Sequence, residues 1–298
     1  MPHSPRSHLT AILNQIDSFP ALPATVTRVM EITGNPESSA NDLMQAILPD
    51  QSMCISILKL ANSAFFGRPR KVSSIEEAIV VLGFQEIRNI ILTQAIFNSF
   101  QKLKNTRKQD IDALWQHSLT CGFAARIIAA HTPGYSPSQL FITGLIHDIG
   151  KLAVLMAVPN IYNPGQILAE QLQRAFFPGE EETMGISHHT VGMHLLNRWL
   201  FPEPLCIAAG YHHHPETAPG DAAFPLIIQM ANILSHVVHA DEKMGGLEIL
   251  TLIRESNPEA VLLWDRYNFH WHRKDIELWL ATLRTDFDDG TLLHIFNE

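Results

Sequence analysis

The chain has 298 residues and a mass of 33.4 kDa, too long for one average domain and about right for two. Hydrophobic residues make up 46% and charged residues 17% of the chain, which excludes a disordered or low-complexity protein. A net charge of −9 argues against a nucleic-acid-binding protein, because such proteins need concentrated positive charge. The 16 histidines nearly match the 21 lysines and arginines, and this excess is the most unusual feature of the composition.

The spacing of the cysteines and the length of the apolar runs indicate the cellular compartment of the protein. Cys54, Cys121 and Cys206 are far apart and form no CxxC pair, a usage typical of a reducing environment. No uninterrupted apolar run reaches the roughly 18 residues of a transmembrane helix. We therefore expect a cytoplasmic protein that has no contact with membranes.

Helix signals dominate along the chain. Ser39–Asp42 and Ser74–Glu77 have capping-box spacing and precede runs of apolar residues in helical periodicity. Asp50 can cap the next such run, Gly83 can end another, and Ser136–Gln139 combines a cap with a proline in the first turn. Strand alternation and hairpin turns are absent. The sequence predicts an all-α fold, a helical bundle.

A polar, charged segment at residues 101–110 indicates a domain boundary. We predict an N-terminal helical lobe at 1–105, a helical core at 106–240 and an acidic helical extension at 241–298. The extension contains a cluster of large aromatic residues: Trp264, Tyr267, Trp271 and Trp279. Such a cluster fits core packing and also fits an anchor for a partner protein.

Several histidines occupy positions that indicate burial. His117 shares a helical face with apolar residues, which fits either a hydrogen-bonded core histidine or a metal ligand. His147 and Asp148 are adjacent in a nearly apolar segment, where an unpaired carboxylate would be costly. Lys151 could pair with Asp148 as a salt bridge, and a divalent cation would do so better. Imidazole and carboxylate together suit Fe, Mn, Zn or Ni.

Further histidines follow at His188 and His189 and in the triplet 212–214. The apolar segment 225–239 carries a stripe of polar residues at helical spacing: Gln229, Asn232, His236 and His239. This stripe either faces solvent or belongs to the same site as the other histidines.

The histidine motifs resemble those of a known family. HDIGK, with LWQHSL upstream and YHHHP downstream, resembles the HD superfamily of metal-dependent phosphohydrolases. The segments FPALPATVTRVMEI, ILPDQSMCISILKLANSAFFG, VSSIEEAIVVLGFQEIRNIIL and GISHHTVGMHLLNRW resemble its HDOD branch, the HD-related output domain of bacterial signalling proteins. The resemblance covers residues 10–240 and implies an HD-like core preceded by an additional helical lobe.

By position, the resemblance implies a set of metal ligands: His117, His147, Asp148, His188, His212, His213 and Asn232. The catalytic pattern of the family has an aspartate at the last position. Asparagine offers only a neutral oxygen, so the site lacks one negative charge. In an active enzyme, Lys151, His212 and His213 would bind the phosphate or serve as general acid.

Two functions follow from the resemblance. The first is a regulatory module that acts through protein contacts, with signalling proteins as partners, a retained metal site and impaired catalysis. The second is an active phosphohydrolase or phosphodiesterase, in which the metal lowers the pKa of a bound water. A metal-free protein with packed histidines is a third interpretation, and homo-oligomerisation is left open.

Overall fold

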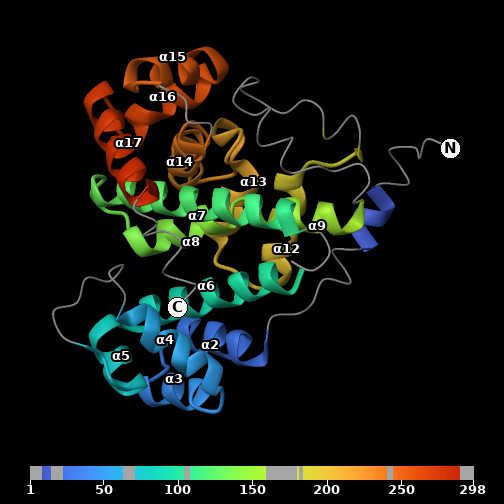
Figure 1. Ribbon diagram of the computed structural model, residues 1–298, viewed down its shortest axis with the longest axis vertical. Coiled ribbons are helices and arrows are strands. Elements are labelled where there is room, and N and C mark those ends of the chain that lie inside the picture. Colours follow the sequence, from blue (N-terminus) through green and yellow to red (C-terminus); the bar gives the residue numbers. More distant parts are fainter. Residues whose placement is uncertain are drawn as a thin grey trace. The chain divides into compact units, whose positions relative to one another are not determined.

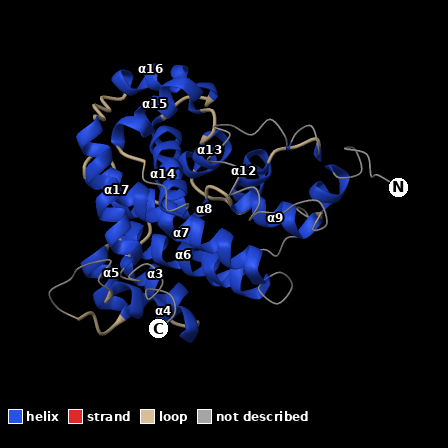
Figure 2. Cartoon of the chain, turned by 45° about the horizontal axis from the view of Figure 1, so that its top comes forward, coloured by secondary structure: helices blue, strands red, loops and turns tan. Residues whose placement is uncertain are grey.

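The computed structural model of the chain describes residues 9–14, 23–62, 71–103, 108–158, 180, 184–239 and 244–288. Within these ranges every regular element is a helix and no strand occurs (Figure 2). The predicted all-α fold is therefore confirmed. Contacts group the chain into two compact units, one built on Pro20–Leu103 and the other on Lys104–Asp289. The predicted boundary after residue 105 lies outside the described residues.

The helices of the two units are labelled in Figure 1. The unit built on Pro20–Leu103 contains α2 (Ala24–Gly34), α3 (Ala40–Ile47), α4 (Gln51–Ala61), α5 (Ile75–Leu82) and α6 (Phe84–Leu103). The unit built on Lys104–Asp289 contains α7 (Lys108–Ala130), α8 (Pro137–Ile146), α9 (Ile149–Ala157), α12 (His188–Arg198), α13 (Glu203–Tyr211), the short 3-10 helix η1 (Pro215–Thr217), α14 (Ala223–His239), α15 (Gly246–Ser256), α16 (Pro258–Arg266) and α17 (Arg273–Asp288).

Polar side chains begin the helices of the first unit where the sequence predicts. Ser39 and Asp42 form a reciprocal capping box at the start of α3. The Asp50 carboxylate accepts a hydrogen bond from the backbone N–H of Met53 at 2.9 Å and so caps α4. These caps satisfy backbone groups that have no partner within the helix.

The turn between α5 and α6 depends on a glycine. Ser74 Oγ accepts the backbone N–H of Glu77 at 3.0 Å and begins α5. Gly83 follows the last residue of α5 with φ of +83°, a left-handed conformation that costs glycine little. The chain bends by 117° at this point before α6 begins.

In the second unit, α7 is the central helix and packs against α8, α14 and α17 (Figure 1). α12 packs against α9 and α13, and α13 packs against α14. The stretch Pro137–Ala157, which comprises α8 and α9, is long and apolar enough to cross a membrane. However, 89% of its most apolar window is buried inside the protein, so these helices serve as core helices here.

The three tryptophans of the aromatic cluster in residues 241–298 lie in the interior of the second unit, and Tyr267 is half-buried. Trp264, Trp271 and Trp279 are all buried. Trp271 stacks on Phe269 with ring centroids 4.6 Å apart and meets Trp279 edge-on at 5.9 Å. Of the two interpretations, the structure favours core packing, because buried rings offer no exposed anchor to a partner.

Gly150 permits the close approach of α9 and α12. A Cβ atom at this position would overlap the carbonyl oxygen of His188 and lie 2.6 Å from the backbone nitrogen of Gly192.

We expect Gly150→Ala to lower the free energy of unfolding by about 3 kcal/mol or more, because backbone atoms cannot move aside without shifting α12. Equilibrium urea unfolding measures this change. Gly34→Ala, where no atom lies within 4 Å of the new Cβ, is the control and should be neutral or slightly stabilising. Equal effects would contradict the close packing.

Candidate metal centre

Asp148 lies at the centre of the histidine cluster. α8 ends at Ile146 and α9 begins at Ile149, so His147 and Asp148 form the break between the two helices. Asp148 occupies the N-cap position of α9, but its side chain makes no capping hydrogen bond. The carboxylate is completely buried and is directed toward other side chains instead.

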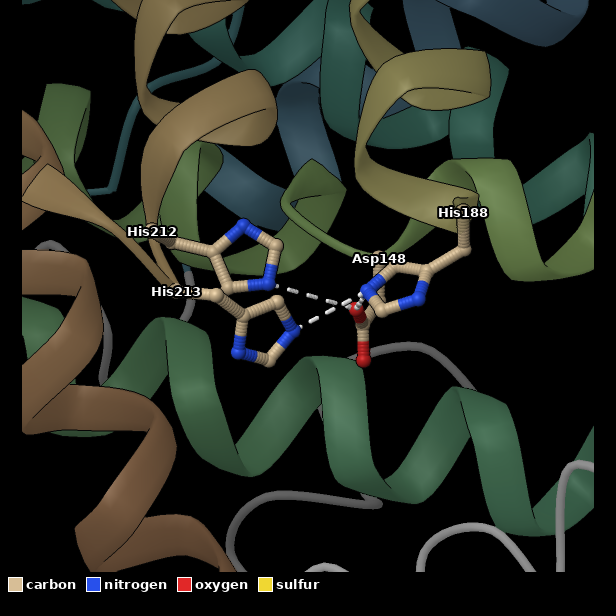
Figure 3. Close-up of side chains that lie close together, drawn as sticks. All are labelled: Asp148, His188, His212 and His213. Atoms are coloured by element: carbon tan, nitrogen blue, oxygen red, sulfur yellow. Dashed lines mark hydrogen bonds and ion pairs between the residues drawn. The ribbon is translucent and has the colours of Figure 1, made fainter. Parts of the chain in front are cut away.

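The Nε2 atoms of four histidines surround the Asp148 carboxylate. His117 and His147 lie 3.2 Å and 3.3 Å from Oδ2. His188 and His212 lie 3.2 Å and 3.7 Å from Oδ1, and Figure 3 shows both rings directed toward the carboxylate. The rings come from α7, the α8–α9 break, α12 and the end of α13. The structure thus brings together residues that the sequence separates by about a hundred positions.

The other nitrogen of each ring, Nδ1, is held by a hydrogen-bonding partner. The Nδ1 contacts are His117 with Ser235 Oγ at 3.0 Å, His147 with Gly144 O at 2.7 Å, His188 with Glu180 Oε2 at 2.7 Å and His212 with Ala209 O at 2.9 Å. Carbonyl and carboxylate oxygens only accept hydrogen bonds, so the neutral rings that meet them carry their proton on Nδ1. The Nε2 lone pairs of these rings are then available to a ligand next to Asp148.

Two of these anchors are local features of helix ends. His147 is the C-cap residue of α8 and His212 is the C-cap residue of α13. Each ring binds the carbonyl oxygen three residues earlier, at Gly144 and at Ala209. The last carbonyls of a helix lack partners within the helix, so a histidine at the cap satisfies one of them and is oriented by it.

His213 extends the cluster on one side. Its Nε2 atom lies 3.2 Å from Nε2 of His188, and its ring lies 4.1 Å from that of His212 (Figure 3). The possible ligand atoms form two groups that share Asp148, one with His188, His212 and His213 and the other with His117 and His147. Within each group these atoms lie within 4.8 Å of one another. We call Asp148 and these five histidines the Asp148 cluster.

Lys151 is also part of this buried environment. Its Nζ atom lies 2.6 Å from Asp148 Oδ2, and both side chains are completely buried. Burial alone would raise the pKa of Asp148, but the positive charges of His147 and Lys151 outweigh burial and hold this pKa well below its usual range. The salt bridge that the sequence suggests for Lys151 is therefore present alongside the imidazoles.

The histidines of the Asp148 cluster differ in protonation. Burial lowers the pKa of His117 to about 3 and the pKa of His212 well below its usual range. Burial acts on His147 as well, but the adjacent Asp148 charge outweighs it and raises the pKa of His147. Burial also lowers the pKa of His213, so His117, His212 and His213 are neutral imidazoles, the form that binds metals, whereas the pKa of His188 is raised like that of His147.

Buried polar atoms without hydrogen-bond partners indicate that the cluster fits a metal ion. His117 Nε2, His147 Nε2, His212 Nε2 and Asp148 Oδ1 are buried and make no aligned hydrogen bond to any partner in the described part of the chain. Each buried polar atom without a hydrogen bond lowers the stability of the folded protein by about 1–3 kcal/mol. One or two divalent cations at this position would pair with these atoms. The nitrogen-rich donor set fits Fe, Mn, Zn or Ni better than Mg or Ca, which prefer oxygen ligands.

The polar stripe of α14 is buried, so the interpretation that it faces solvent is wrong. Ser235 Oγ contacts His117 Nδ1, and the His236 ring lies 4.5 Å from the His117 ring. Asn232 lies on the same helical face, and its buried Oδ1 atom makes no hydrogen bond within the described residues. His236 therefore lies on the His117 side of the Asp148 cluster, whereas Gln229 donates a hydrogen bond to the carbonyl oxygen of His213 at 3.4 Å.

Glu180 is a site residue that no motif of the sequence predicts. Its carboxylate is buried and binds His188 through Oε2. Glu180 stands in the acidic run Glu180–Glu182, which resembles a solvated charge run, and no helical spacing relates it to His188. Only the requirement that a ligand histidine has a partner for its second nitrogen could have indicated such a residue.

Comparison with known proteins agrees with this geometry. The HDOD domain profile matches residues 19–215 of the chain. The chain belongs to the HDOD family. The HDOD match includes all six residues of the Asp148 cluster and the segment Pro20–Leu103, and it ends before α14.

Solved structures share the fold of this HDOD protein. An HDOD domain protein of unknown function from Geobacter sulfurreducens superposes with a TM-score of 0.68 at 24% identity, covering 98% of this chain and 99% of that one. A protein from Shewanella amazonensis SB2B, provisionally named a phosphohydrolase, gives 0.65 at 19% identity over 93% and 99%. A protein from Marinobacter aquaeolei VT8, provisionally named a signal transduction protein, gives 0.58 at 18% identity over 95% and 67%.

A curated relative extends beyond this chain. An uncharacterized protein of Treponema pallidum (strain Nichols) is 27% identical over 224 residues. The match covers 74% of this HDOD chain and 42% of the relative, so the chain spans less than half of the relative's length.

The buried ion pair between Lys151 and Asp148 leads to a prediction for the metal-free HDOD protein. Removal of one partner of a buried pair typically costs about 3–5 kcal/mol, because the other charge stays buried. We expect Lys151→Met to lower the free energy of unfolding by this amount, measured by urea unfolding with a chelator present. Lys59→Met, on the exposed surface of α4, should change stability by less than about 0.5 kcal/mol. A Lys151→Met protein as stable as the wild type would contradict a stabilising pair.

Proposed function

We propose that this HDOD protein is a regulatory module of bacterial signal transduction, which acts through protein contacts and holds a divalent transition metal without efficient hydrolysis. The observation that carries the proposal is the charge of the Asp148 cluster. Asp148 is the one carboxylate among the described residues that meets the Nε2 atoms, and Lys151 already pairs with it. Asn232, at the position of a final acidic ligand, adds no negative charge.

The charge deficit limits how many metal ions the site can hold. His117, His147 and Asp148 would hold one ion, and His188, His212 and His213 would complete the second group. Two divalent ions beside Lys151 would face a single carboxylate ligand, which leaves their mutual repulsion largely uncompensated. When bound, the metal would supply Lewis acidity to a water or an oxyanion. The residues present favour a single, structural ion.

Exposed apolar side chains support the proposed role in protein contacts. The described residues of the Asp148 cluster all belong to the unit built on Lys104–Asp289. The unit built on Pro20–Leu103 exposes apolar side chains, among them Ile55 on α4 and Val80 on α5. We propose other signalling proteins or a second copy of the chain as partners, in the cytoplasm and without nucleic acid or membrane contacts.

An active metal-dependent phosphohydrolase is the second candidate, and the complete set of histidines favours it. In that case Lys151, His212 and His213 would bind the phosphate or donate a proton to the leaving group. These side chains lie in or beside the Asp148 cluster, close enough to meet an oxyanion bound there.

Metal content tests the proposal directly. We expect protein purified without a histidine tag to contain close to one equivalent of a transition metal by plasma mass spectrometry. His147→Ala should lose most of this metal, because it removes a ring that meets Asp148 at 3.3 Å. His272→Ala, at an exposed histidine far from α8 in sequence, is the control and should keep the metal. Wild-type protein without metal would refute the metal site.

Asn232→Asp tests the charge argument. We expect this substitution to tighten metal binding by about tenfold or more, because a unit charge beside a divalent ion is worth more than 1.4 kcal/mol even at an effective dielectric of about 20. Isothermal titration of the metal-free proteins measures the change.

Wild-type protein should not hydrolyse bis(p-nitrophenyl) phosphate. Turnover that requires the bound metal would support the phosphohydrolase instead, and unchanged affinity would place Asn232 outside the ligand set.

A further inference from the structure

Glu180 contacts His188 at two points. Its Oε2 atom accepts the Nδ1–H of the His188 ring at 2.7 Å and the backbone N–H of the same residue at 2.7 Å. The Glu180 side chain is only 4% exposed, although it comes from an acidic run. A buried carboxylate that makes two hydrogen bonds to one residue fixes both the backbone and the ring of that residue.

The backbone contact replaces a helix cap. His188 is the first residue of α12, and Ser187, at the N-cap, makes no side-chain capping bond. Ser187 Oγ instead contacts His189 Nε2 and Thr190 Oγ1, each at 2.9 Å. Glu180 therefore satisfies the N–H group of the first turn and places its negative charge at the positive end of the helix.

The ring contact sets which nitrogen faces the Asp148 cluster. With Nδ1–H bound to Glu180, His188 presents Nε2 to Asp148 Oδ1 at 3.2 Å and to His213 Nε2 at 3.2 Å. A carboxylate behind a ligand histidine makes the ring a stronger metal ligand. Consistent with this arrangement, the Glu180 charge outweighs burial and raises the pKa of His188.

We propose that Glu180 is a positioning residue that supplies, through His188, part of the negative charge that α14 lacks at Asn232. The other oxygen of Glu180, Oε1, is buried and accepts no hydrogen bond from the described residues. The contacts that this carboxylate makes within the described chain are therefore to His188. This inference rests on the proposed metal site and adds a residue whose charge acts on the metal through His188.

Metal affinity in a pair of Glu180 variants tests the charge. Glu180→Gln keeps an oxygen that accepts both N–H groups but removes the charge. We expect it to weaken Co²⁺ binding by about 10-fold to 100-fold, measured by titration of the metal-free protein. Glu203→Gln, at an exposed position in the first turn of α13, makes the same charge change and should bind Co²⁺ like the wild type. Wild-type affinity in a Glu180→Gln protein would overturn the proposal.

A double variant separates charge from structure. If the missing charge is the cause, Asn232→Asp in the Glu180→Gln protein should restore Co²⁺ affinity to about the wild-type value. Failure of this rescue, with both single variants folded by circular dichroism, would show that the role of Glu180 is structural and would overturn the charge compensation.

The tautomer of His188 gives a readout that needs no metal. Long-range 15N–1H spectra of the metal-free protein should show His188 protonated at Nδ1 in the wild type and in Glu180→Gln. Glu180→Ala should lose this preference. A proton at Nε2 but not at Nδ1 in the wild type would overturn the positioning role. If wild-type protein binds no Co²⁺, the proposed function and the charge compensation fail, and these spectra still decide the positioning role.

Discussion

The burial of the Asp148 carboxylate is the constraint on which the second unit depends. An ionised carboxylate without partners in a protein interior costs many kilocalories per mole, so the surrounding helices must provide compensating groups. Lys151, in the first turn of α9, provides its ammonium group at 2.6 Å from Asp148 Oδ2. The helices α7 and α12 and the end of α13 provide imidazoles. The close packing of α9 on α12 at Gly150 brings His188 within reach. The same helix packing that forms the core therefore also brings the compensating groups to the buried carboxylate.

The orientation of the histidines comes from ordinary features of helical structure. Two rings bind the free carbonyls at helix ends, one binds a serine on α14, and one binds a buried glutamate. Each partner holds Nδ1 and leaves Nε2 toward Asp148. Because three of the four anchors lie on helices, their Nε2 atoms are oriented before any ligand binds, which lowers the entropic cost of binding a metal.

The balance of charge separates the two candidate functions. Three of the five imidazoles in the Asp148 cluster have a lowered pKa and are neutral, and Lys151 offsets the single carboxylate that meets the Nε2 atoms. Glu180 adds negative charge behind His188, whereas Asn232 adds none. A site of this kind can hold a transition metal by nitrogen ligation, yet it is poorly suited to hold two ions for phosphoester hydrolysis. The proposal of a regulatory HDOD module that keeps its metal follows from this balance.

The helical fold, the caps at Ser39, Asp50 and Ser74, and the HDOD family could all be predicted from the sequence, because they depend on local spacing and on motif order. The sequence also singled out every member of the Asp148 cluster, through their positions in apolar segments and through the family resemblance. Tertiary structure alone decided that the α14 stripe is buried, that the tryptophans pack in the core and that Glu180 holds His188. These contacts join residues with no periodic relation in the chain, so only the packing of the helices brings them together.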